Sequence, residues 1–287
     1  MSRRHPTFAL VTGCGQGGIG EALVREYAKH NMHPIATILP SESSVHLAEA
    51  DITWFYLDVT SEESIVALKK SVQDLTGGQL DILVNNAGIL YTMPAVDTDV
   101  GSVQHMFDVN VFGPMRMVRH FHGMLITARG TIVNIGSIGG VVPYVYNSAY
   151  NASKAALHHW SNTLRVEMSP FHVKVLTIIL GEVGTNILKG DRDRQLPKES
   201  YFSPLAAEFQ QHVQRTPLAP DRFEYAQNIV SQSLRASPPI WFWYGPATRF
   251  IRLLDIFAPR RTWDYLLWGI FNLKKLKLSM EHRHGTG

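Results

Sequence analysis

Cysteine is nearly absent from the 287-residue chain, which has Cys14 alone. One thiol excludes an internal disulfide and fits a reducing compartment. Uncharged apolar runs of about 18 residues are also missing, so the sequence predicts no membrane-spanning helix. The N-terminal segment M-S-R-R-H-P-T has no apolar signal core and leads straight into a strand. These absences together predict a cytoplasmic protein, and we expect no metal site.

Net charge is small, because 27 Lys and Arg residues face 24 Asp and Glu residues and leave +3. Nucleic acid is therefore not an expected partner. The charge is uneven: residues 246–287 carry eight Lys or Arg and three Asp or Glu, a local +5 that leaves −2 for the rest. A basic, aromatic-rich tail favours contact with a membrane surface or an anionic ligand; the alternative is a solvated helix packed on the domain.

The chain opens with the order strand, glycine turn, helix. The short apolar run F-A-L-V-T at residues 8–12 is typical of a strand buried on both faces. It leads into G-C-G-Q-G-G-I-G, and residues 21–30 then have helical composition. Glycines let a backbone approach a pyrophosphate closely, and the N-terminus of a helix offers free N–H groups to it. This context predicts a dinucleotide site.

Strands and helices then alternate. Further strands are expected at residues 35–39, 54–59, 81–84, 131–135, 173–179 and 240–245. Ser61 is expected to cap a helix that runs to residue 74. A long helix over 99–128 is expected to be interrupted at 110–114, with a local kink where Pro114 removes a backbone donor. The pattern predicts an α/β fold: a single doubly wound, Rossmann-like parallel sheet with helices on both faces and ligands at the strand C-termini.

Two segments fall outside this alternation. Residues 184–217 follow the sixth strand and are mostly polar, which favours a lid over the substrate against a disordered surface loop. Residues 246–287 form a helical, aromatic-rich extension, with helices expected at 247–257 and 262–273. We therefore divide the chain into a dinucleotide-binding and catalytic domain, 1–245, and a C-terminal extension, 246–287.

An acid–base pair lies in the middle of the chain. Tyr150 and Lys154 are four residues apart at the head of an Ala-rich helical segment, so they share one helix face. Ser137 ends a β-rich run that can aim its hydroxyl at the same point. A nearby ammonium favours the phenolate and should lower the pKa of a tyrosine from its usual value of about 10. The three side chains supply the acid–base half of a hydride transfer.

Taken in order, the motifs resemble the short-chain dehydrogenase/reductase family. The likeness rests on T-G-C-G-Q-G-G-I-G at 12–20, L-D-V at 57–59, N-N-A-G at 85–88, N-V-F-G at 110–113, Ser137, Y-N-A-S-K at 150–154 and G-E-V-G-T at 181–185. The additional residue in the glycine loop and the pattern from Pro259 to Asp264 are similar to the fungal 1-acyldihydroxyacetone-phosphate reductase subgroup. Leu180 departs from the family, in which proline usually precedes this glycine.

The resemblance implies a catalytic tetrad. Tyr150 would be the general acid/base, Lys154 would lower its pKa and hold the nicotinamide ribose, and Ser137 would orient the carbonyl. Asn110 would hold a water that relays protons to Lys154. The implied cofactor-binding residues are Gly13, Gly17, Ile19, Asp58, Val59, Asn85, Ala87, Gly88, Tyr150, Lys154, Val183 and Thr185. The implied substrate-facing residues are Ser137, Leu90, Met93, Val141, Val142, Tyr144 and Glu182.

The choice of cofactor depends on the end of the second strand. An acid there would bind the ribose 2′-OH of NAD and repel the 2′-phosphate of NADP, but Ile38 occupies this position. The basic residue that family members use for a 2′-phosphate is missing too, since Leu39 and Pro40 stand in its place. Ser41, Ser43 and Ser44 could hydrogen-bond a phosphate or serve as helix caps. We expect a preference for NADP(H), with NAD(H) as the alternative.

The function expected is an NAD(P)H-dependent oxidoreductase that interconverts a lipophilic ketone and a secondary alcohol, such as a lipid, a steroid or a fungal secondary-metabolite intermediate. The alternatives are an acyl-dihydroxyacetone-phosphate reductase at a membrane surface and a cofactor-binding module without turnover. The extension would contact a membrane, wall the pocket or contact another subunit, and membrane contact would make the protein peripheral to an internal membrane or lipid droplet. By family analogy, helices at 103–122 and 150–168 pair across a twofold axis, which implies a homodimer or homotetramer.

Overall fold

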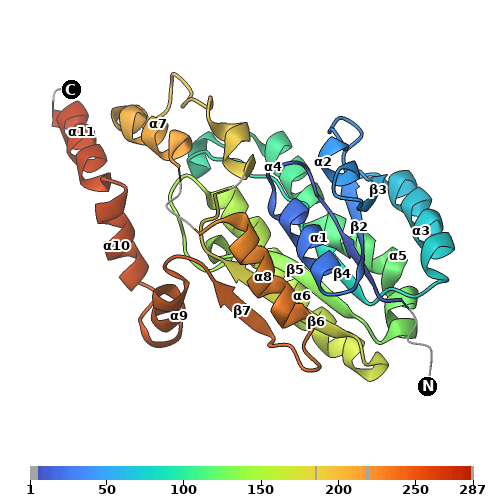
Figure 1. Cartoon of the computed structure of the whole chain (residues 1–287). Coiled ribbons are helices and arrows are strands. Elements are labelled where there is room, and N and C mark those ends of the chain that lie inside the picture. Colours follow the sequence, from blue (N-terminus) through green and yellow to red (C-terminus); the bar gives the residue numbers. More distant parts are fainter. Residues whose placement is uncertain (1–5, 185, 217–219, 286–287) are drawn as a thin grey trace.

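The computed structural model describes residues 6–184, 186–216 and 220–285. Its centre is a seven-stranded, all-parallel sheet in the order β3-β2-β1-β4-β5-β6-β7 (Figure 1). The strands are β1 Phe8–Val11, β2 His33–Ile38, β3 Thr53–Tyr56, β4 Ile82–Asn85, β5 Thr131–Ser137, β6 Lys174–Leu180 and β7 Trp241–Tyr244. The expected doubly wound, Rossmann-like sheet is confirmed.

The strand order reverses next to β1. The chain runs outward from β1 through β2 to β3, returns to the other side at β4, and continues outward to β7. Every residue of β1 and β4 is buried, because helices cover both faces of the sheet at its centre. The C-terminal ends of β1 and β4 diverge into different loops, and this reversal is where an open α/β sheet leaves room for a ligand.

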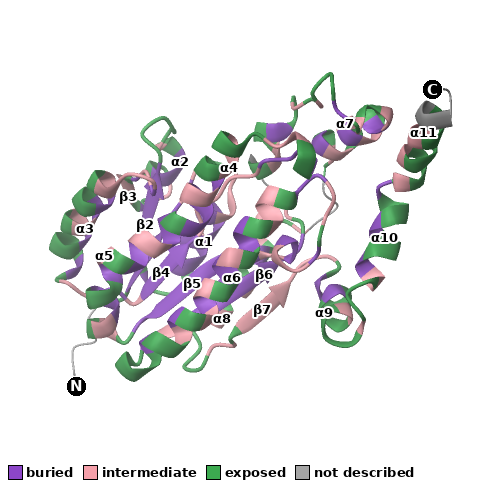
Figure 2. Cartoon of the chain, turned by 180° about the vertical axis from the view of Figure 1, so that it is seen from behind, coloured by how far each residue is buried: buried purple, intermediate pink, exposed green. Residues whose placement is uncertain are grey.

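Helices pack on both faces of the sheet (Figure 1). On one face, α1 (Ile19–Lys29) packs against α8 (Arg222–Ser233), where the hydroxyls of Tyr27 and Ser233 hydrogen-bond at 2.9 Å. The opposite face holds α3 (Glu62–Thr76), α5 (Gly113–Ala128) and α6 (Ser148–Met168). Figure 2 shows the buried strands between these two layers. A short helix, α2 (Val45–Ala48), lies between β2 and β3.

Two local signals concern α3 and the long helix before β5. Ser61 caps α3 as expected, since its hydroxyl accepts from the Ser64 N–H at 3.1 Å. The expected interruption of the long helix is confirmed, since α4 (Val100–Phe107) passes into a π-helical turn, Asp108–Phe112, before α5 begins. The turn lies just before Pro114, so the proline itself is not its centre. Pro114 lies in the first turn of α5, where its missing N–H costs least.

The polar segment after β6 is ordered over the residues described. It forms two short 3₁₀ turns, Asn186–Asp191 and Ser203–Leu205, and helix α7, Ala206–Gln214. The buried Asp191 carboxylate accepts from the Thr92 backbone N–H at 2.7 Å and from Arg194 Nε at 2.7 Å. The Ser200 hydroxyl donates to Asp97. These contacts hold the segment against the loop between β4 and α4.

The extension contains three helices rather than the two expected: α9 Thr248–Phe257, α10 Thr262–Ile270 and α11 Leu273–Gly285. Trp263, Leu267 and Phe271 are buried against Tyr146 and Phe209 of the body. Lys275 Nζ also lies 2.9 Å from the Glu208 carboxylate on α7. One edge of the extension is thus packed on the body. Among the helices of the described ranges, none is both long enough and apolar enough to cross a membrane.

Candidate active site

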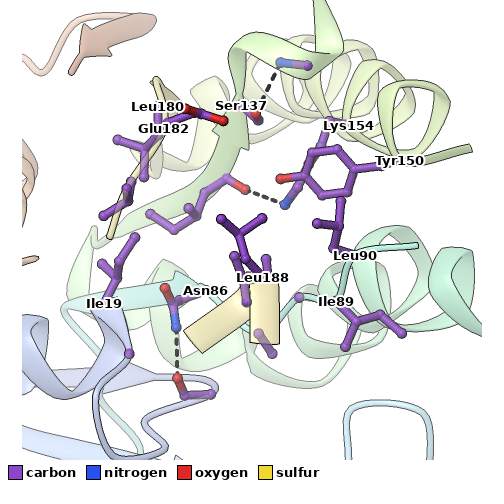
Figure 3. A pocket seen from close by; sticks show the side chains of 18 of the residues that line it. Ile19, Asn86, Ile89, Leu90, Ser137, Tyr150, Lys154, Leu180, Glu182 and Leu188 are labelled. Atoms are coloured by element: carbon purple, nitrogen blue, oxygen red, sulfur yellow. Dashed lines mark hydrogen bonds between the residues drawn. The ribbon is translucent and has the colours of Figure 1, made fainter. Parts of the chain in front are cut away.

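A cavity of about 780 Å³ opens at the C-terminal ends of β1, β4 and β5 (Figure 3). Its residues come from segments far apart in the sequence. The glycine loop after β1 and the end of β2 line one end, and α6 and the end of β5 line the middle. The loop after β6, α7 and the extension line the other end. A long cavity at this position can hold an extended ligand beside a second, smaller one.

The glycine loop has a backbone path that requires glycine. Gly13 has φ +70°, and a Cβ there would lie 2.8 Å from the Ala87 Cα. The Asn86 amide fixes the path by donating to the carbonyls of Thr12, at 2.8 Å, and Gly13, at 2.9 Å. Helix α1 starts after Gly18 with no side-chain cap, so its first N–H groups are left for a ligand. The residues present therefore fit a bound pyrophosphate.

Ser137, Tyr150 and Lys154 lie together in the middle of the cavity (Figure 3). Ser137 is the last residue of β5, and Tyr150 and Lys154 lie in the first two turns of α6. Lys154 Nζ donates to the Ile135 carbonyl at 2.9 Å and lies 5.7 Å from the centroid of the Tyr150 ring. The Ser137 Oγ accepts from the Gly139 N–H at 3.0 Å. Ser137 therefore keeps its hydroxyl proton, which it shares with the neighbouring Tyr150 oxygen and can donate to a ligand oxygen.

Burial dominates the titration of this pair. It lowers the pKa of Lys154 from 10.5 to about 8, since the ammonium is cut off from water. Burial also raises the pKa of Tyr150, and a hydrogen bond with Ser137 offsets only part of this. The expected fall in the pKa of Tyr150 is thus wrong for the protein alone, because desolvation outweighs the hydrogen bond with Ser137. At neutral pH Tyr150 is a proton donor.

Asn110 lies in the π-helical turn with its amide fully buried. Its Oδ1 accepts from the Ile89 N–H at 2.9 Å, and its Nδ2 donates to the Ile89 carbonyl at 2.9 Å and to the Ser153 hydroxyl at 3.1 Å. A Cβ at Gly88 would lie 3.3 Å from that oxygen and 3.7 Å from Lys154 Nζ. Asn110 therefore holds the segment after β4 beside the lysine. Its role in a water relay stays a prediction.

Most of the predicted cofactor residues line the cavity: Gly13, Ile19, Asp58, Val59, Ala87, Gly88, Tyr150, Lys154 and Val183. Asn85 does not, because its amide points into the core and donates to Asn134 at 2.7 Å. Its neighbour Asn86 faces the glycine loop instead, as the alternation of side chains at a strand end requires. Gly17 lies beside the lining residues Gln16 and Gly18. Thr185 lies outside the described residues.

The predicted substrate residues divide into two groups. Leu90, Tyr144 and Glu182 line the cavity with Ser137. Met93, Val141 and Val142 lie behind its wall. The Met93 N–H pairs with the Tyr146 carbonyl at 2.6 Å and its side chain packs with Tyr91 and Met106, while both valines pack in the cluster beneath the extension.

The cavity also contains residues that we did not predict, namely His105 from α4 and, at the far end, His212, Arg215, Ile270 and Phe271. Arg215 Nε donates to the Glu182 carboxylate at 2.8 Å and its Nη1 to the His212 carbonyl at 2.6 Å. Burial, aided by the charge of Arg215, lowers the pKa of His212 to about 3, so its ring is neutral. The one sequence signal for Phe271 is the periodic spacing of apolar residues in the extension, which places it on a helix face that packs inward.

Comparisons with known proteins agree with this geometry. The short chain dehydrogenase family model matches residues 7–196. The short-chain dehydrogenase virD of Hypocrea virens is 67% identical over 274 residues, 96% of each chain. The NADPH-dependent 1-acyldihydroxyacetone phosphate reductase of Schizosaccharomyces pombe is 41% identical over 201 residues, 69% of this chain and 68% of that protein. A closed serine dehydrogenase complexed with NADP+ superposes with a TM-score of 0.70 at 26% identity, over 84% of this chain and 96% of that one.

The chain therefore belongs to the short-chain dehydrogenase family. It is an oxidoreductase that acts on CH–OH groups, and it binds NAD(P)H. The glycine loop, the uncapped start of α1 and the Ser137–Tyr150–Lys154 set are the parts of this structure that fit the cofactor.

Replacing Lys154 by Met should make the protein more stable at pH 7 and, at the same time, much less active. The folded pKa of Lys154 is about 8 against an ordinary 10.5, so at pH 7 folding buries an ammonium at a cost. Allowing for the lost bond to Ile135, we expect the variant to be about 1–3 kcal/mol more stable at pH 7. Between pH 8 and 10.5 the unfolded wild type binds more protons than the folded form, so the stability of the wild type rises with pH. The advantage of the variant over the wild type should therefore disappear by pH 10.5.

Urea unfolding of both proteins at pH 7 and pH 10.5, with turnover measured alongside, tests this prediction. Turnover should fall at least about a hundredfold. A variant that is less stable than the wild type at both pH values would contradict the account of the lysine.

Proposed function

We propose that the protein reduces a lipophilic ketone to a secondary alcohol with NADPH, and catalyses the reverse oxidation when the alcohol is in excess. The observation that carries this proposal is a single cavity with a polar reacting centre and an apolar far end. Ser137, Tyr150 and Lys154 lie at its middle, and apolar side chains line the space beyond them, among them Leu90, Ile138, Leu188, Ile270 and Phe271. That lining suits a bulky apolar substrate better than a sugar.

The residues divide the reaction into separate tasks. The cofactor supplies the hydride to the carbonyl carbon. Ser137 donates a hydrogen bond to the carbonyl oxygen, since its own Oγ is already fixed by the Gly139 N–H. Tyr150 donates its proton to that oxygen, and its raised pKa keeps the phenol protonated at neutral pH. Lys154, held by Ile135, keeps a cation beside the phenolate that forms.

Replacing Tyr150 by Phe should remove the proton donor and leave the cavity otherwise unchanged. We expect kcat for NADPH oxidation with a panel of lipophilic ketones to fall about 10²- to 10⁴-fold. Cofactor binding, followed by quenching of intrinsic fluorescence, should stay within about threefold. Tyr201→Phe, at an exposed tyrosine, is the matched control. Full turnover by the Tyr150 variant would exclude this mechanism, and a wild type inactive on every ketone would favour a cofactor-binding module instead.

An acyl-dihydroxyacetone phosphate substrate is the second candidate. Its support is the likeness to the Schizosaccharomyces pombe reductase and a single cation, Arg215, at the substrate end of the cavity. Glu182 already neutralises this guanidinium at 2.8 Å, so a phosphate would have to displace a carboxylate. Comparing turnover of acyl-dihydroxyacetone phosphate with that of a neutral ketone of equal chain length distinguishes the two substrates.

The preference for NADPH is part of the proposal. It is supported by the NADPH and NADP+ named for the two related proteins and by Ile38, which replaces the acid expected of an NAD site. One acid does line this end of the cavity. The Glu42 carboxylate accepts from the Leu39 N–H at 2.8 Å and overlaps the place that a side chain at Gly15 would take. Its charge opposes a 2′-phosphate.

Replacing Glu42 by Gln should therefore strengthen the preference for NADPH. Removing one negative charge near the 2′-phosphate should raise kcat/KM for NADPH about three- to tenfold, with little change for NADH. Steady-state kinetics with both cofactors measure this, and Glu49→Gln, at an exposed position that ends α2, is the control. An unchanged ratio would remove Glu42 from cofactor selection, and a strong NADH preference in the wild type would overturn the NADPH proposal.

We also propose that the extension makes the protein peripheral to an anionic membrane. Helix α10 has only Thr262 and Asp264 as polar residues, both in its first turn, yet it leaves Tyr265 74% and Ile270 70% exposed, which is unfavourable in water. Phe250, Leu253 and Phe257 are exposed on α9. In the part of the chain that the structure describes, no acidic partner lies within ion-pair distance of four neighbouring cations, Arg249, Arg252, Arg260 and Arg261. A twofold contact through this face would bring like charges together, whereas anionic headgroups would neutralise them.

Flotation with vesicles tests this contact. We expect the protein to bind vesicles of phosphatidylcholine with phosphatidylserine and to bind phosphatidylcholine alone more weakly. Phe257→Asp with Trp268→Glu should abolish binding, whereas Val96→Asp, on an exposed apolar residue of the body, should not. Wild-type protein that stays in the soluble fraction with both vesicles would contradict the proposal. The double variant should keep the homodimer or homotetramer, because we expect that contact to use α4, α5 and α6 and not the extension.

A further inference from the structure

His158 lies one helical turn beyond Lys154 on α6 and is only 3% exposed. Its ring occupies space that two glycines leave open. A Cβ at Gly136 would overlap His158 Nε2, and a Cβ at Gly140 would overlap Cε1. The ring also packs against Trp241, with centroids 5.2 Å apart. The imidazole is therefore built into the junction between α6, the end of β5 and the loop that follows it.

The ring holds the backbone of the catalytic serine. The Ser137 N–H donates to His158 Nε2 at 3.2 Å, so this nitrogen must carry the lone pair and Nδ1 the proton. Lys154 Nζ donates to the carbonyl of Ile135, two residues earlier on β5. Successive turns of α6 thus bind alternate residues at the end of β5. One of these bonds fixes Lys154, and the other fixes the residue whose hydroxyl faces the substrate.

Stability alone does not explain an imidazole at this position. Its Nδ1 is buried and has no hydrogen-bond partner among the residues that the structure describes. The ring thus satisfies one N–H, that of Ser137, and leaves its own Nδ1–H without an acceptor, so its net contribution to stability is small. Burial and the charge of Lys154 also lower the pKa of the ring to about 3, so His158 is not a general acid or base at working pH.

We propose that His158 is a positioning residue, which holds Ser137 in the geometry that hydride transfer requires by accepting its backbone N–H. The proposal rests on the reductase function above. His158 is placed to touch neither the substrate nor the reacting atoms; it acts through the serine. Misplacing a catalytic group by about 1 Å can cost about a hundredfold in rate, so one hydrogen bond at this position has a measurable effect.

The test is a double-mutant cycle in the full-length protein. His158→Leu should lower kcat about 10- to 100-fold, with the KM for NADPH within about twofold and the melting temperature little changed, because one unpaired N–H replaces another. In a Ser137→Ala background the same change should cost less than about threefold, because there is no hydroxyl left to position. His158→Gln, whose Oε1 can accept from the Ser137 N–H, should restore at least about a third of kcat. His159→Leu, at the exposed neighbouring position, is the control.

Each outcome decides for or against this role. Equal losses in the wild-type and Ser137→Ala backgrounds would show that His158 does not act through the serine, and an unchanged kcat for His158→Leu would show that the bond is dispensable. If His158→Leu fails to fold, the comparison of His158→Gln with His158→Asn decides, since the shorter amide cannot reach the Ser137 N–H. Failure of the reductase proposal would look different, because the wild type itself would turn over no ketone.

Discussion

The site depends on the attachment of the first turns of α6 to the end of β5. The bond from Lys154 to the Ile135 carbonyl fixes the lysine, and the bond from the Ser137 N–H to His158 fixes the serine one helical turn away. Tyr150 then lies between them at the start of the same helix. Because the three side chains proposed to be catalytic belong to two rigid elements, the loops and the extension around the cavity can vary without moving them.

Burial gives this junction its electrostatic character. It moves the pKa of Lys154 down and that of Tyr150 up, so both groups are driven toward their neutral forms before any ligand binds. The folded protein therefore holds a destabilised cation beside a protonated phenol. Such a pair is poised for a reaction in which negative charge forms on the tyrosine oxygen, since the lysine charge is then compensated. Burying the Lys154 cation is destabilising, and the apolar burial of the central strands β1 and β4 offsets that free energy.

Local patterns are enough to predict the sheet, the path of the glycine loop and the proximity of Ser137, Tyr150 and Lys154, since each depends on residues close in sequence. Prediction from the sequence fails where contacts between distant segments decide which way a side chain points. Asn85 and Asn86 are adjacent and chemically identical, and only the pleat at the end of β4 turns one to the core and the other to the glycine loop. Met93 is predicted to face the substrate, but its backbone pairs with that of Asn147, just before α6, and its side chain lies outside the cavity lining. Phe271 and His212 reach the cavity only because α10, α11 and α7 pack on the same cluster.

Transfer of label from the cofactor to the product tests the central claim most directly. The protein is given NADPH or NADH with deuterium at C4 of the nicotinamide, together with a panel of lipophilic ketones, and the products are analysed by mass spectrometry. The account predicts an alcohol that carries one deuterium on the carbinol carbon, formed in step with the oxidised cofactor. Cofactor oxidation without a deuterated alcohol, or no reaction with either cofactor across the panel, would contradict it.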